Sequence, residues 1–162
     1  MSKLPSSGDT HRGPYGRLLT MTALSFAAMY ILMYAMVDRV ENIHLGLGQA
    51  YMAGLMTAPM LVFELLLMGS MYQDRRLNAA ALSAGVVVGV ICFVAIRQQA
   101  LIGDREFLRA MIPHHSGAIL MCRKAPIKDP RLRSLCRQII VGQQAEIDEM
   151  NAMLSGAPAP QR

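Results

Sequence analysis

Three long apolar runs dominate the first two thirds of the chain. They occupy residues 18–37, 49–72 and 77–96 and contain a single charged side chain, Glu64. The hydrocarbon core of a bilayer is about 30 Å thick and takes about 20 helical residues to cross. The pattern therefore predicts a three-span membrane domain over residues 17–98, with a disordered cytoplasmic tail over residues 1–16 before it. Pro59 predicts a kink in the second span.

The last third of the chain has a different pattern, in which apolar positions recur at helical spacing. Ala125-Pro126 separates two such segments, and Asp104 and Asp129-Pro130 are typical helix starts. We therefore predict an all-α protein in which residues 99–155 form an antiparallel helical hairpin and residues 156–162 a disordered tail. Because so short a pair of helices buries little core, we expect it to pair with a second copy in a homodimeric four-helix bundle, or to dock on another protein or on the membrane surface.

The charge pattern sets the expected orientation in the membrane. Basic residues gather in the N-terminal tail and at Arg75 and Arg76, whereas the loop after the first run has one, Arg39. The positive-inside rule then places the N-terminus in the cytoplasm and the hairpin outside it. We predict a multi-pass protein of the bacterial inner membrane with a periplasmic hairpin, in contact with membrane lipid. The first run has no small-residue cleavage site, which predicts a retained span.

Net charge and composition exclude several other classes. The chain has a net charge of +5 and is 53% hydrophobic, but its basic residues are not interleaved with aromatic ones. Such a distribution argues against a nucleic-acid partner. No nucleophile and base stand in a recognisable pattern, so we expect no enzyme. A di-iron bundle needs two Glu-x-x-His motifs, and the single one, at Glu41 and His44, excludes that centre.

Side chains that bind soft metals gather in two short segments of the predicted hairpin. One helical stripe carries Met111, His114 or His115, and Met121 or Cys122, and the other carries Gln143, Glu146, Met150 and Met153. Thioether and imidazole favour Cu(I) over magnesium or calcium, and zinc gains little from methionine. Adjacent helical residues diverge by about 100°, so the two histidines cannot both face inward. Core packing of the methionines and solvation of the histidines are the alternative explanation.

Folding the hairpin about residues 127–128 gives an expected register. It places Cys136 level with Cys122 and Glu146 near Met111. The positions of the two cysteines fit two small packed side chains, a disulfide or a pair of metal ligands.

The pattern Met111-Ile-Pro-His114-His115-x-x-Ala118-x-x-Met121, followed by Gln143-x-x-Glu146-Ile147-x-x-Met150, resembles the domain of unknown function family 305 over about residues 104–154. The resemblance is to a CopM-like, membrane-anchored member. It implies half of a ferritin-like four-helix bundle that binds copper, with silver as an analogue. The residues it implies as ligands are Met111, His114, His115, Met121, Met150 and Met153. Cys122, Cys136 and Glu146 are additional candidates outside this resemblance, and the two cysteines depart from it, because small residues such as Ala are expected at their positions. Longer members have two helix pairs, which again indicates a homodimer here.

These observations together predict a membrane-anchored, extracytoplasmic copper-binding protein that buffers, delivers or gives resistance to copper, with a copper-handling partner protein. One alternative is an interaction or assembly module that binds no metal. A second is a transport accessory that uses Glu64, an ionisable group inside a span. The second alternative would also use two methionine ladders, Met29, Met33 and Met36 in the first run and Met52, Met56 and Met60 in the second.

Overall fold

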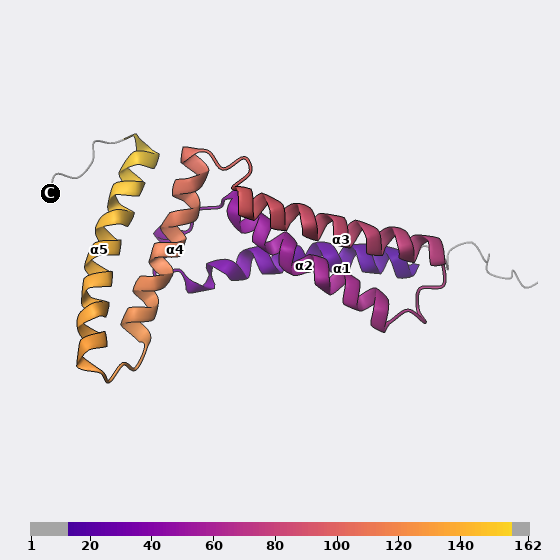
Figure 1. The fold of residues 1–162 in the computed structure, drawn as a ribbon, viewed down its shortest axis with the longest axis horizontal. Coiled ribbons are helices and arrows are strands. Elements are labelled where there is room, and N and C mark those ends of the chain that lie inside the picture. Colours follow the sequence, from indigo (N-terminus) through magenta and orange to yellow (C-terminus); the bar gives the residue numbers. More distant parts are fainter. Residues whose placement is uncertain (1–12, 157–162) are drawn as a thin grey trace, which may run out of the picture. The chain divides into compact units, whose positions relative to one another are not determined.

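The computed structural model describes residues 13–156, and over this range the protein is helical without strands, as expected (Figure 1). The elements in order are α1 (Gly13–Leu32), the short 3-10 helices η1 (Met33–Met36) and η2 (Val40–Asn42), α2 (Leu47–Leu67), α3 (Arg75–Gln98), α4 (Asp104–Lys124) and α5 (Pro130–Ser155). They form two compact units. One contains Tyr51–Gln98 and the chain up to Tyr30, and the other contains Ile31–Ala50 and the chain from Gln99 onward.

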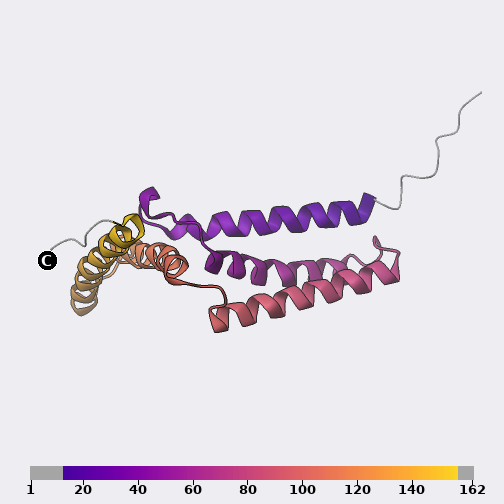
Figure 2. The same cartoon turned by 90° about the horizontal axis from the view of Figure 1, so that it is seen from above.

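The first unit contains the helices that are long and apolar enough to cross a membrane. These segments are Gly13–Met36, Leu47–Leu67 and Arg75–Gln98, and Figure 2 shows α1, α2 and α3 extended along one another. Close approach of α3 to α2 depends on glycine. A Cβ atom at Gly85 would lie 3.2 Å from Leu61 Cδ2, and one at Gly89 would lie 3.2 Å from Ala58 Cβ. The three predicted membrane helices are therefore confirmed as helices of suitable length and composition.

The ends of these helices differ from the predicted ones. Helix α1 begins at Gly13 because Pro14 is well suited to a first helical turn, so residues 13–16 are helical rather than part of a disordered tail. The rest of that predicted tail, residues 1–12, lies outside the described residues. Helix α2 ends at Leu67 instead of residue 72, since Gly69 and Ser70 are poor helix formers.

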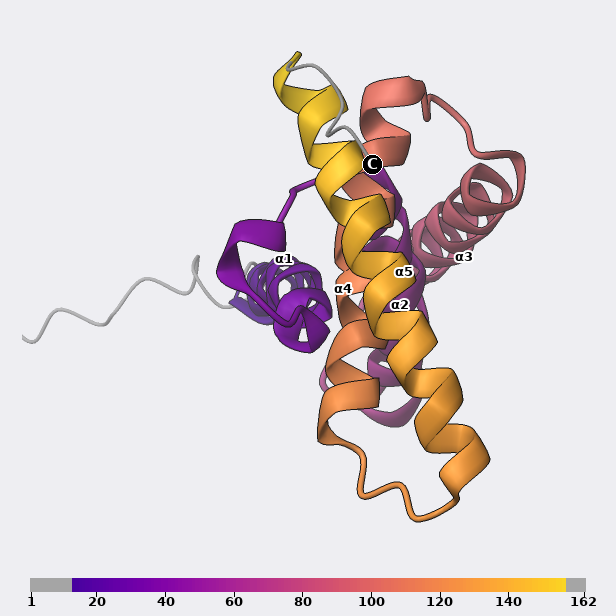
Figure 3. The same cartoon turned by 90° about the vertical axis from the view of Figure 1, so that its left-hand side faces the viewer.

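The second unit is built on α4 and α5, which lie side by side and run in opposite directions (Figures 1 and 3). Their shared core consists of Ile112, Ile119, Ile147 and Met150. Asp129 caps α5 by accepting hydrogen bonds from the backbone N–H groups of Arg131 and Leu132, and Gly156 ends it with a φ of 69°. Asp104 is the first helical residue of α4 rather than its cap, which is Gly103. The predicted tail from residue 157 lies outside the described residues.

The segment before α2 also belongs to this second unit. Both η1 and η2 contact α4. Gly117 of α4 lies next to η1, because a Cβ there would be in ordinary van der Waals contact, 3.5 Å from the backbone oxygen of Met36. Part of the surface of α4 is thus covered by the same chain. The homodimer itself stays a prediction.

Candidate metal site

His115 lies at the centre of the hairpin and connects its two helices. Its Nε2 is 2.8 Å from Glu146 Oε2 on α5, and its Nδ1 is 2.9 Å from the backbone oxygen of Met111, one turn earlier on α4. A carbonyl oxygen only accepts hydrogen bonds, so Nδ1 carries a proton and donates it. In a neutral ring, the lone pair of Nε2 then points at the carboxylate of Glu146. Two lone pairs repel each other, so the contact requires a proton or a metal cation shared by Nε2 and Oε2.

Two methionines lie near the contact between His115 and Glu146, and both are farther than it from the turn that joins α4 and α5. Met111 precedes His115 by one turn on α4, and Met150 follows Glu146 by one turn on α5. Met150 belongs to the buried core, and Met111 packs against it. We call Met111, His115, Glu146 and Met150 the His115 cluster.

The donors of the His115 cluster suit a soft or borderline metal ion. Imidazole and thioether favour copper, and the Nδ1–H bond to Met111 fixes the ring so that Nε2 is the ligating atom. Within residues 13–156, no group of three or more His, Cys, Asp and Glu side chains could hold a metal ion. A metal bound at this cluster therefore needs the methionines as ligands.

The other methionines and histidines that were predicted as ligands lie at exposed positions. His114 is exposed, and its ring centroid lies 6.1 Å from that of His115. Met121 and Met153 are 58% and 55% exposed. Met121 is ten residues from Met111, which corresponds to about 15 Å along α4. The six predicted methionines and histidines thus cannot all bind one ion within a single chain.

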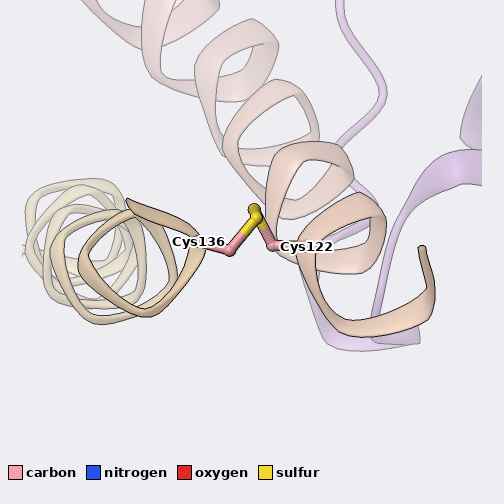
Figure 4. Close-up of a disulfide and its surroundings, with 2 residues drawn as sticks. All are labelled: Cys122 and Cys136. Atoms are coloured by element: carbon pink, nitrogen blue, oxygen red, sulfur yellow. A yellow bond between two sulfur atoms is a disulfide. The ribbon is translucent and has the colours of Figure 1, made fainter. Parts of the chain in front are cut away.

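Cys122 and Cys136 form a disulfide between α4 and α5 (Figure 4). Their Cα atoms lie 5.2 Å apart, which confirms the expected level of the two cysteines. Of the three explanations that fit the sequence, the structure has the disulfide, and Cys92 is the free cysteine. The oxidised pair leaves neither sulfur as a thiolate ligand.

Glu146 pairs with His115, which is hydrogen-bonded to the backbone oxygen of Met111, the neighbour expected for Glu146. Helix α4 ends at Lys124, directly before Ala125-Pro126, where the sequence predicts the break between the two helices.

Asp38 has a structural role that the sequence reasoning missed. Its side chain is only 2% exposed, and Oδ1 accepts hydrogen bonds from Ser116 at 2.5 Å and from Asn42 at 3.0 Å. Arg123 donates to Oδ2 at 3.0 Å. Burial raises the pKa of Asp38, but the hydrogen bonds from Ser116 and Asn42 and the charges of Arg123 and Arg39 together bring it below its usual value. Asp38 is therefore an ionised carboxylate, and its partner Ser116 directly follows His114 and His115 in the chain.

Two further contacts hold the segment before α2 against the hairpin. Glu106 accepts a hydrogen bond from the backbone N–H of Leu47 at 2.9 Å, and His44 Nε2 lies 3.1 Å from Asn151 Oδ1. The hydrogen bond from Leu47 lowers the pKa of Glu106, and Arg109 adds to this against the opposing effect of burial. No short sequence pattern predicts contacts between residues so far apart in the chain.

Comparisons with known proteins agree with the expected family. Residues 93–154 match the family model described as Domain of unknown function (DUF305). An uncharacterized protein of Acanthamoeba polyphaga mimivirus is 38% identical over 140 residues, which cover 85% of this chain and 90% of that protein. This similarity extends well beyond residues 93–154, so it includes much of the membrane half. No solved structure matches the chain. The chain belongs to the domain of unknown function family 305.

Proposed function

We propose that this protein is a membrane-anchored copper-binding protein and that the His115 cluster binds Cu(I). The observation that carries the proposal is the contact between His115 Nε2 and Glu146 Oε2 across the hairpin, with Met111 and Met150 packed one turn away. A metal ion replaces the proton between the two side chains, and the thioethers complete its ligands. Such a site buffers copper or delivers it to a partner protein.

The donors come from one chain, so the proposed site does not depend on a second copy. Thioethers and a histidine bind Cu(I) without a thiolate, which matters because both hairpin cysteines are in the disulfide. Silver(I) shares this ligand preference and serves as a probe. Because the metal competes with a proton at Nε2, affinity should rise with pH.

We also propose that the hairpin lies outside the cytoplasm, in the periplasm if the host is a bacterium. Disulfides persist mainly in oxidising compartments, and the pair Cys122–Cys136 supports this location. A C-terminal reporter that is active only outside the cytoplasm tests it. Activity of the reporter is the expected result, and activity of a cytoplasmic reporter at the same position contradicts the proposed orientation.

A competition titration of the full-length protein with a Cu(I) chelator tests the copper claim. His115→Ala removes the imidazole and should weaken binding at least tenfold. Met150→Leu keeps much of the side-chain volume but removes the thioether, and it should weaken binding as well.

Met121→Leu provides the matched control. It makes the same chemical change at an exposed position outside the His115 cluster, and its affinity should equal that of the unchanged protein. Equal affinities for Met150→Leu and Met121→Leu would reject the His115 cluster as the copper site. If the unchanged protein also fails to take Cu(I) from the chelator, the alternative of an assembly module that binds no metal gains support.

A further inference from the structure

Glu64 is the one acidic residue within the three helices that are apolar enough to span a membrane. Moving an ionised carboxylate into a bilayer is costly unless a cation neutralises it. None of the ion pairs formed among residues 13–156 includes Glu64. A cation smaller than a basic side chain therefore has to neutralise the carboxylate of Glu64.

Tyr72 provides the contact that Glu64 does make. The Tyr72 hydroxyl donates a hydrogen bond to Glu64 Oε1 at 2.9 Å, and Tyr72 is 5% exposed. Its ring packs against Tyr15 of α1, with the centroids 5.4 Å apart. Tyr72 is part of the turn that joins α2 and α3, so its hydroxyl connects this turn to the carboxyl group of Glu64.

On its other side, Glu64 faces a narrow cleft between α1 and α2. The cleft is lined by hydroxyl, thioether and apolar side chains, namely Met21, Thr22, Ser25, Thr57, Met60 and Leu61. Glu64 is its sole charged lining residue, and the cleft is too narrow to admit a water molecule. A hydrated metal ion does not fit there, whereas a proton needs no additional space.

The two threonine hydroxyls do not serve as hydrogen-bond donors to Glu64. Thr22 donates to the backbone oxygen of Leu18 at 2.9 Å, and Thr57 donates to that of Ala53 at 2.8 Å. Tyr72 is therefore the titratable group in contact with Glu64, and Tyr15 is the next one behind it. Burial raises the pKa of Tyr72, so its hydroxyl keeps its proton at neutral pH.

We propose that Glu64 of the first unit is a protonated carboxyl group. It exchanges its proton with water at the α2–α3 turn through the Tyr72 hydroxyl. In the loading step, Tyr72 transfers its proton to the carboxylate and takes one from a hydronium ion, which becomes water. Tyr72 ends the step as it began, and Glu64 gains one proton. The reverse sequence releases it. This site is independent of copper binding at the His115 cluster.

Infrared spectroscopy of the full-length protein in lipid nanodiscs tests this proposal. A C=O stretching band of a protonated carboxyl should be present at neutral pH and should disappear in Glu64→Gln. After transfer to heavy water, the band should shift as its proton exchanges. Tyr72→Phe keeps the ring packed against Tyr15 but removes the hydroxyl, and it should slow this exchange at least tenfold.

Tyr30→Phe removes a tyrosine hydroxyl elsewhere in the first unit. In this variant the proton of Glu64 should exchange at the original rate. Absence of the band at neutral pH would overturn the protonated state of Glu64. Equal exchange rates in Tyr72→Phe and Tyr30→Phe would overturn the role of Tyr72. Glu64→Asp gives a second check, because a shorter side chain that no longer reaches the Tyr72 hydroxyl should retain the band and exchange slowly.

Discussion

Ser116 binds Asp38 through two hydrogen bonds that join positions 78 residues apart. Its hydroxyl donates to Asp38 Oδ1 at 2.5 Å and accepts from the Asp38 backbone N–H at 2.8 Å. Ser116 is fully buried and directly follows the two histidines of the motif. One residue of the motif thus fastens the segment before α2 to the hairpin, while its neighbour His115 faces the other helix.

Ser116→Ala should destabilise the second unit. The substitution removes both hydrogen bonds and leaves the part-buried backbone N–H of Asp38 without its partner, although Asn42 still donates to Oδ1. An unsatisfied group of this kind costs about 1–3 kcal/mol. Chemical denaturation of the detergent-solubilised protein, followed by circular dichroism, measures the change. Ser155→Ala is the control, since this exposed serine bonds only to its own helix. Equal stabilities of the two variants would contradict a fastening role for Ser116.

The same unit should lose stability in acid. The folded-state pKa values of Asp38 and Glu106 are lowered from reference values of 3.8 and 4.5. Their contribution is fully present above those reference values and is lost as the pH falls through the lower folded values. We expect stability to decline below about pH 5. Asp38→Asn should flatten this decline in a series of denaturation curves, and an unchanged slope would refute the contribution of Asp38.

The membrane helices could be predicted from the sequence because their signal is local. Long apolar runs between charged turns identify α1, α2 and α3, and Asp129-Pro130 identifies the start of α5. Exact ends were less predictable, because they depend on individual residues such as Pro14 and Gly69. The donor residues of the hairpin could also be identified, since they share helical faces.

Selection among those donors required the side-chain contacts between the two helices. Glu146 contacts His115 although Met111 lies only one turn away, and no pattern in the sequence decides between the two. In the sequence, Asp38 only marks the end of the first apolar run, and nothing near it indicates Ser116 as its partner. Ser116 and Gly117, two small residues in the middle of a helix, were the available signal that something packs closely there.

Removal of the disulfide should destabilise the hairpin without unfolding the membrane helices. The pair closes a loop with a sequence separation of 14, and a loop of this size contributes about 3 kcal/mol in the chain-entropy model. Cys122→Ser with Cys136→Ser should therefore unfold at lower denaturant concentration than Cys92→Ser, the matched control. An assay of the denatured, unreduced protein should find one free thiol per chain, and three would show that the bond is absent.

X-ray absorption spectroscopy of the Cu(I)-loaded full-length protein tests the central claim most directly. We predict a first shell with two sulfur scatterers from Met111 and Met150 and with nitrogen or oxygen scatterers from His115 and Glu146. Met150→Leu should lose one sulfur scatterer, whereas Met121→Leu should leave the spectrum unchanged. A shell without sulfur, or the loss of sulfur in Met121→Leu instead, would contradict copper binding at the His115 cluster.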